Sequence, residues 1–168
     1  NALALNHGRP LQMGLREMSN IDDMATWALG VSLPPEAAAL YEGPVTRSVF
    51  GVDAERAEVV LQAPIPEGTR AILCHRTPGA VFDRALRMAE RLRARVNGHP
   101  PVLALSFECG GRPGPFLGDV RAREEVLAMQ DRIGPRLPWL GMYAWGEIFP
   151  IAGTSYFHNY TCPVCLVL

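Results

Sequence analysis

The sequence predicts an α+β domain, a mostly antiparallel sheet of about six strands with two to four helices packed against it. Three observations favour this class. The expected elements run as helices, three strands, a helix, a strand, a helix and two strands. Only one β-helix-β crossover is strongly suggested, and hairpins dominate the other connections. The chain has no internal repeat and no low-complexity linker, so residues 1–168 are predicted to form a single domain.

The N-terminal part is expected to be helical after one short strand. Residues 3–6 are apolar and can form an edge strand. Residues 10–18 predict a helix, because a proline opens the segment and apolar side chains recur on one face. A second helix is expected to pass through Trp27 and Ala28 and to end at Gly30.

A helical turn and three strands are expected next. The turn begins at residues 34–36, where two prolines precede a glutamate. Residues 45–52 and 57–61 predict a hairpin, because two β-rich segments flank a short polar stretch. Residues 69–75 alternate between the two faces of a strand, which predicts a third one.

The second half of the chain alternates helices with strands. The clearest helix follows Pro78, where apolar residues recur at helical spacing until an Asn-Gly pair at residues 97–98. Residues 102–107 are continuously apolar, as expected of a central strand that is covered on both faces.

A last helix and two strands complete the predicted fold. Asp119 can cap a helix that runs to Ile133, where Gly134-Pro135 closes it. The final strands are expected at residues 137–145 and 156–168.

Charge and composition exclude several classes of partner. The formal net charge is −1, which favours neither nucleic acid nor an anionic membrane surface. No apolar run approaches the ~20 residues of a membrane span. No signal-peptide pattern is present, so a cytoplasmic location is predicted. The first two residues, Asn1-Ala2, resemble the scar of tag removal, and we expect a domain cut from a longer protein.

Three polar side chains stand out in the most apolar and aromatic part of the chain, Trp139–Thr161. They are Glu147, His158 and Asn159. Burying a polar group without a partner costs roughly 1–3 kcal/mol, so each of them needs one. The partner is either another side chain of the core or a bound ligand, and the sequence leaves both open.

The loop after residues 102–107 carries two further candidates. Arg112 offers a fork of donors, either to a ligand carboxylate or phosphate or to an internal carboxylate. Cys109 can act as a nucleophile if an imidazole such as His158 lies beside it, or it can pack as a buried thiol.

No motif predicts a metal ion or another cofactor. Prolines at positions 113 and 115 remove backbone amides that a phosphate cradle needs. Cys162 and Cys165 have the C-x-x-C spacing, but residues three apart on a strand point to opposite faces, and no second such pair exists. Core packing is therefore the favoured role of these two thiols.

Several short segments carry a family resemblance. Residues 141–150 read Gly-Met-Tyr-Ala-Trp-Gly-Glu-Ile-Phe-Pro, and residues 158–161 read His-Asn-Tyr-Thr. Together they resemble the C-terminal domain of the FIST family of sensory proteins, which carries a G-f-y-x-x-G-E-I strand followed by an h-N-x-T strand. Phe-Glu-Cys-Gly-Gly-Arg at 107–112 is similar to the family's f-x-C-x-x-R element. Arg47 and the segment 65–68 lie where similar v-R and i-p-x-G elements occur.

The resemblance implies a bacterial signal-input domain that binds a small ligand such as an amino acid, and not an enzyme. It also implies a separate N-terminal FIST domain or a signalling output domain as partner in the full-length protein. In this hypothesis Arg112 binds the ligand carboxylate and Glu147 binds its ammonium. The complete set of predicted ligand-binding residues is Arg47, Cys109, Arg112, Tyr143, Trp145, Glu147, His158 and Asn159.

Two other functions remain open. A hydrolase or transferase built on Cys109 and His158 requires a thiolate beside an imidazole. A protein-interaction module that binds no ligand would instead have Arg112 and Glu147 paired with each other, away from any pocket.

Overall fold

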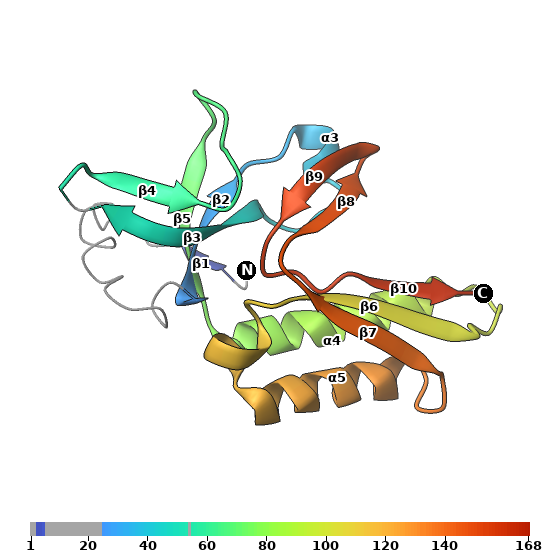
Figure 1. Ribbon diagram of the computed structural model, residues 1–168. Coiled ribbons are helices and arrows are strands. Elements are labelled where there is room, and N and C mark those ends of the chain that lie inside the picture. Colours follow the sequence, from blue (N-terminus) through green and yellow to red (C-terminus); the bar gives the residue numbers. More distant parts are fainter. Residues whose placement is uncertain (1–2, 6–24, 54) are drawn as a thin grey trace. The chain divides into compact units, whose positions relative to one another are not determined.

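The computed structural model describes residues 3–5, 25–53 and 55–168. The chain divides into two compact units, whose elements are labelled in Figure 1. The first unit comprises Asn1–Thr77 and Gly146–Tyr160, and the second unit comprises Pro78–Trp145 and Thr161–Leu168. The predicted α+β class with mainly antiparallel pairing is confirmed, and the strands are shared among sheets of five, three and two. That residues 1–168 form a single domain stays a prediction.

An antiparallel sheet forms most of the first unit (Figure 1). Its strands are β1 (Leu3–Leu5), β2 (Trp27–Val31), β3 (Val45–Asp53), β4 (Glu58–Leu61) and β5 (Ala71–Arg76). They lie in the order β1-β5-β2-β3-β4, and each neighbouring pair is antiparallel. The predicted hairpin, the predicted third strand and the predicted edge strand are confirmed.

The helix predicted through Trp27 and Ala28 is wrong, because both residues belong to strand β2. This strand lies at the centre of the sheet, between β3 and β5, and Ala28 is completely buried. Pairing with two strands from later in the chain outweighs the local helical preference of this segment. The helix predicted at residues 10–18 lies outside the described residues.

Gly30 does not end a helix but permits close packing in this central strand. A Cβ at position 30 would lie 2.6 Å from Cγ of Pro44 and 2.8 Å from Sγ of Cys74. We therefore expect Gly30→Ala to lower the free energy of unfolding by about 1–3 kcal/mol, as measured by urea denaturation. Gly51→Ala is the control in the same sheet, since its methyl group would meet Val60 at an ordinary 3.8 Å. Equal losses in the two variants would contradict the packing argument.

A helical turn and a separate hairpin complete the first unit. Helix α3 (Pro35–Ala38) confirms the turn predicted at residues 34–36. Strands β8 (Glu147–Ile151) and β9 (Thr154–His158) pair antiparallel with each other. A core cluster of Ala37, Val45 and Ile151 joins α3, β3 and β8.

The strand predicted at residues 156–168 is wrong in extent, because the segment contains two strands in different units. Strand β9 ends at His158, and β10 (Val164–Val167) begins six residues later in the sequence. Tyr160 has φ of 62°, a left-handed conformation that does not occur in a regular strand. Pro163 also lacks the amide that a sheet ladder needs.

Two helices cover one face of the three-stranded sheet in the second unit (Figure 1). The central strand β6 (Leu103–Cys109) pairs in parallel with β7 (Trp139–Ala144) and antiparallel with β10. Helices α4 (Pro78–Ala94) and α5 (Asp119–Ile133) are those predicted from the sequence. The core between them is built from Ala85, Ala89, Met129 and Ile133.

The opposite face of this sheet is apolar and has no helix of the second unit on it. Alternation along β6 and β7 places Leu105, Phe107, Leu140 and Met142 on the same side. Phe107 is 39% exposed and Met142 is 61% exposed. Strand β6 is therefore central, as predicted, but the helices described in the second unit, α4 and α5, cover only one of its two faces.

Candidate functional site

A buried ion cluster joins β6 to α5 in the second unit. After β6, the chain turns so that the Arg112 amide donates to the Cys109 carbonyl at 3.0 Å. The Arg112 side chain donates from Nε to Glu108 Oε1 at 3.0 Å and from Nη2 to Glu125 Oε2 at 2.7 Å. The exposed fractions are 5% for Arg112, 5% for Glu108 and 0% for Glu125. Arg112 therefore holds two internal carboxylates, one of the two roles that the sequence left open.

The charges of this cluster do not cancel, since two carboxylates share one guanidinium. Burial lowers the pKa of Arg112, but interactions with the acidic groups Glu125, Cys162 and Glu108 outweigh burial, and the pKa lies above its usual value. Burial raises the pKa of Glu108, and Arg112 opposes that shift. Glu125 Oε1 has no hydrogen-bond partner among the described residues. The cluster can therefore accept one further proton or cation.

A groove of about 580 Å³ lies in the second unit. It is lined by Pro113, Gly114, Asp119, Ala122, Arg123, Val126 and Tyr143. Pro113 directly follows Arg112, and Ala122 and Val126 precede and follow Glu125 on α5. Tyr143 is the register partner of Glu108 on the neighbouring strand. Each member of the ion cluster thus lies close, along the chain or across the sheet, to a residue that lines the groove.

Tyr143 is the predicted ligand-binding residue that lines this groove, and it is 54% exposed. Its pKa is raised by burial and also by Glu108, Cys162, Asp119 and Glu125. All four of these groups are acidic, so the Tyr143 hydroxyl lies in a negative potential.

Sequence reasoning missed Asp119 and Arg123 as groove residues. Asp119 was expected to cap α5, but Gly118 occupies the cap position and Asp119 is the first helical residue. The available signal was an acidic and a basic residue four apart, which places both on one helix face. Neither the groove nor its opposite charges could be predicted without knowing which other segments of the chain pack beside that helix face.

The other two predicted residues of the second unit, Cys109 and Trp145, do not line the groove. Cys109 is 6% exposed at the end of β6, and alternation places its side chain on the opposite sheet face from Glu108. Trp145 is 79% exposed. Its ring lies next to Gly110, where an added Cβ atom would be 3.5 Å from the ring.

Arg47 and Asn159 connect strands of the first unit. Asn159 Oδ1 accepts from the Ser48 amide at 2.9 Å, and its Nδ2 donates to Gln62 Oε1 at 2.5 Å. Arg47 Nη1 donates to the Phe157 carbonyl at 2.5 Å. Both side chains are buried, and burial lowers the pKa of Arg47. These contacts join β3 to the end of β9 across more than a hundred residues of chain.

Glu147 and His158 are register partners on β8 and β9, and both are buried. The His158 ring stacks on Phe149, with centroids 3.4 Å apart and planes 6° apart. Its Nε2 lies 3.3 Å from the Phe149 carbonyl, so this nitrogen is the protonated donor, and Nδ1 has no hydrogen-bond partner in the described part of the chain. Burial lowers the pKa of His158 to about 4, with Arg47 adding to the shift and the Phe149 carbonyl opposing it. His158 is therefore neutral at pH 7.

The eight predicted residues fall into two groups of four. The first unit contains Arg47, Glu147, His158 and Asn159, and the second unit contains Cys109, Arg112, Tyr143 and Trp145. A nucleophilic Cys109 would need an accessible imidazole beside it. His158 is completely buried within the first unit, stacked and hydrogen-bonded there. The ligand-binding roles of the eight residues stay a prediction.

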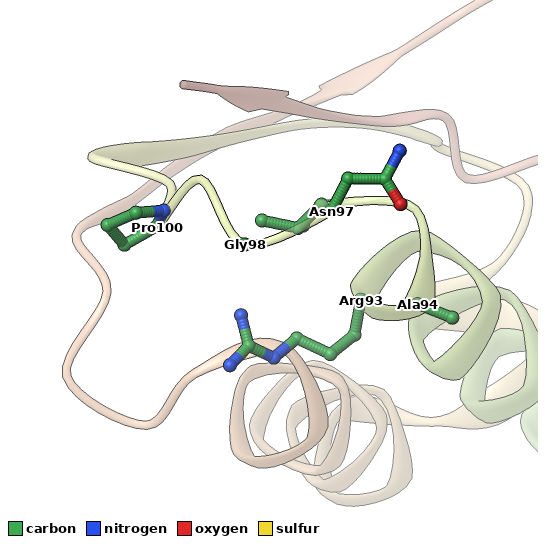
Figure 2. A pocket seen from close by; sticks show the side chains of 6 residues that line it. Arg93, Ala94, Asn97, Gly98 and Pro100 are labelled. Atoms are coloured by element: carbon green, nitrogen blue, oxygen red, sulfur yellow. The ribbon is translucent and has the colours of Figure 1, made fainter.

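A smaller depression of about 380 Å³ lies at the C-terminal end of α4 (Figure 2). It is lined by Arg93, Ala94, Val96, Asn97, Gly98 and Pro100. Figure 2 shows the Arg93 side chain extending below the loop that carries Gly98 and Pro100, while the Asn97 amide points away. This depression has one charged side chain and none of the predicted site residues, so the groove beside Tyr143 is the stronger candidate.

Within residues 3–5, 25–53 and 55–168, no group of three or more His, Cys, Asp and Glu side chains is arranged to hold a metal ion. Cys162 packs against the helical core of the second unit, whereas Cys165 is exposed. In the same part of the chain, no helix has the length and the apolar character that crossing a membrane requires.

Several mycobacterial proteins are similar to this chain. This chain is 30% identical over 169 residues to the uncharacterized protein Mb0898c of Mycobacterium bovis, and the aligned segment covers 95% of this chain and 42% of that protein. It is 36% identical over 88 residues to the uncharacterized protein Rv0628c of Mycobacterium tuberculosis, covering 52% of this chain and 22% of that protein. The chain thus spans less than half the length of these relatives. No solved structure matches it.

The FIST C domain is the family whose sequence model matches, over residues 8–150. The matched range includes the v-R, i-p-x-G, f-x-C-x-x-R and G-E-I segments and ends before His158. Because the match covers most of the chain, the chain belongs to the FIST C domain family of signal-transduction sensory domains.

Proposed function

We propose that this domain binds a small zwitterion, such as an amino acid, and is the signal-input part of a longer protein. The groove of the second unit carries the proposal. It offers one carboxylate, Asp119, one guanidinium, Arg123, and apolar surface from Tyr143, Val126 and Pro113. An amino acid presents opposite charges at its two ends and is held by such a combination. The groove volume also lies within the range of roughly 300–1,000 Å³ that is usual for small-molecule sites.

The proposal gives Arg112 an indirect role. Because its guanidinium is bonded to Glu108 and Glu125, it fixes those carboxylates beside the groove. Arg112 is thus a positioning residue, and Arg123 replaces it as the group that meets the ligand carboxylate. Direct ligand contacts of Glu147, His158 and the other predicted residues are not required.

A sensory domain needs a partner that receives its signal. The relatives extend well beyond the matched segment, since this chain covers 42% of the Mycobacterium bovis protein. We infer that an N-terminal FIST domain or a signalling output domain of the full-length protein is that partner, and that the protein acts in the cytoplasm.

Titration calorimetry against the common amino acids tests the proposed function. We expect at least one of them to bind with 1:1 stoichiometry. Asp119→Asn and Arg123→Gln should each weaken that binding about 10-fold, because each removes a charge-assisted hydrogen bond. Both side chains are exposed, so the variants should keep their fold.

Two matched control substitutions are available, one on α5 and one just after it. Asp131→Asn and Arg136→Gln remove the same charges at exposed positions that do not line the groove. Their affinities should equal that of the parent chain. Absence of binding by every amino acid, or equal losses in the groove variants and the controls, would show that the groove is not an amino-acid site.

A further inference from the structure

We propose that the end of the groove beside Tyr143 and Glu108 is a cation site, which binds the primary amine or guanidine of a ligand and rejects a carboxylate. The proposal rests on the proposed function, because it assigns a polarity and a ligand class to the same groove. A zwitterion would lie with its ammonium at Tyr143 and its carboxylate at Arg123.

The first support is the balance of charge. Three carboxylates belong to the groove and the adjacent ion cluster, namely Glu108, Asp119 and Glu125. Two guanidiniums, those of Arg112 and Arg123, oppose them. With all five ionised, three negative and two positive charges leave an excess of one negative charge. The excess lies in a buried region, where charges interact more strongly than they do in water.

The second support is the position of this excess charge. Glu108 faces Tyr143 across two neighbouring strands, on the side of the sheet that carries α5. Glu125 is completely buried, and its Oε1 finds no donor among the residues that the structure describes. Besides burial, the groups that raise the pKa of the Tyr143 hydroxyl are acidic side chains, namely Glu108, Cys162, Asp119 and Glu125. A ligand cation beside this hydroxyl would therefore be stabilised, even without direct contact with Glu125.

The third support is that the nearest guanidinium is already occupied. Arg112 is bonded to two carboxylates at 3.0 and 2.7 Å and is 5% exposed, so it presents no accessible positive charge at this end. The groove's own guanidinium, Arg123, lies one helical turn after Asp119 on α5. Together these positions give the groove a negative end and a separate positive group, and thereby an orientation for its ligand.

Three small probes test the amine end and the carboxylate end of a ligand separately. They are n-butylamine, butyrate and L-norvaline, which carry the amine, the carboxylate and both groups. Each is titrated at constant ionic strength, with binding followed by the NMR shifts of groove amides. We expect n-butylamine and norvaline to shift these amides, and butyrate to bind at least about 10-fold more weakly than n-butylamine. Butyrate that binds as tightly as n-butylamine, or no shift with n-butylamine, would overturn the inference.

Variants at the cation site test its residues with n-butylamine as the probe. Glu108→Gln should weaken n-butylamine about 5-fold and leave butyrate unchanged, because it removes one negative charge. If that buried variant does not fold, Tyr143→Phe provides the test at a half-exposed position and should weaken n-butylamine about 3-fold through loss of the hydroxyl. Unchanged affinity in the variant that folds overturns the assignment, and Asp131→Asn is the matched control.

The two proposals can fail separately. Binding of an amino acid in the panel together with a preference for butyrate over n-butylamine would leave the proposed function standing and remove the cation site. Binding of n-butylamine without binding of any amino acid would leave the cation site standing and remove the proposed function.

Discussion

Replacing Arg112 by methionine is expected to destabilise the second unit by about 3–5 kcal/mol, because it leaves two buried carboxylates without their shared guanidinium. Glu108 and Glu125 are 5% and 0% exposed, so water cannot take over the lost hydrogen bonds. Urea denaturation followed by circular dichroism and tryptophan fluorescence would measure the loss. The fluorescence includes Trp139, whose indole donates to Ser106 Oγ at 2.9 Å within the same unit.

Two comparisons isolate the buried charge as the cause. Arg132 pairs with Glu90 at 3.0 Å on the surface of the same unit, so Arg132→Met should cost no more than about 1 kcal/mol. Adding Glu108→Gln and Glu125→Gln to Arg112→Met should recover most of the stability, since no unpaired charge then remains. A loss as small as that of Arg132→Met, or a triple variant no more stable than the single one, would refute the argument.

Acidification is expected to remove on the order of 3 kcal/mol from the first unit through His158 alone. The folded state holds the pKa of His158 at about 4, because the ring is buried, whereas the ordinary value is 6.5. Between these values the unfolded chain binds a proton that the folded chain does not. Stability is therefore complete above pH 6.5, falls as the pH drops, and loses no more from this group below pH 4.

Urea denaturation at a series of pH values, with NMR titration of the imidazole, would measure this dependence. His158→Phe should remove the slope between pH 6.5 and 4, because phenylalanine retains the stacking on Phe149 but does not titrate. His99→Gln, at an exposed position, should leave the slope unchanged. An imidazole that titrates near 6.5 in the folded protein would disprove the prediction.

Local pattern was sufficient for much of the fold. The stripe of apolar residues in α4 and the polar break between β3 and β4 both concern residues close in sequence, and both elements form as predicted. Strand β2 could not be predicted this way, because its conformation depends on pairing with β3 and β5. The left-handed backbone at Tyr160 was also hidden, since tyrosine rarely adopts it and no glycine marks the turn.

The candidate site was predictable in parts. An aromatic stretch with isolated polar residues correctly indicated buried polar groups at Glu147, His158 and Asn159. The partners of Asn159 could not be identified, because Ser48 and Gln62 lie about a hundred residues earlier in the sequence. Similarly, Arg112 was singled out for its donors, but its bond to Glu125 depends on how α5 returns to the sheet. Sequence thus indicated which groups need partners, and tertiary packing decided which partners they have.

The division of the first unit into two segments has a consequence for biosynthesis. Thr46 Oγ1 donates to the Asn159 carbonyl at 2.5 Å, across 113 residues. Helices α4 and α5 and strands β6 and β7 leave the ribosome between these two partners. Closing so long a loop is slow, and its entropic cost falls when the intervening chain is already compact. The first unit, although it begins first, thus receives its last two strands, β8 and β9, only after residues Pro78–Trp145 of the second unit have been synthesised.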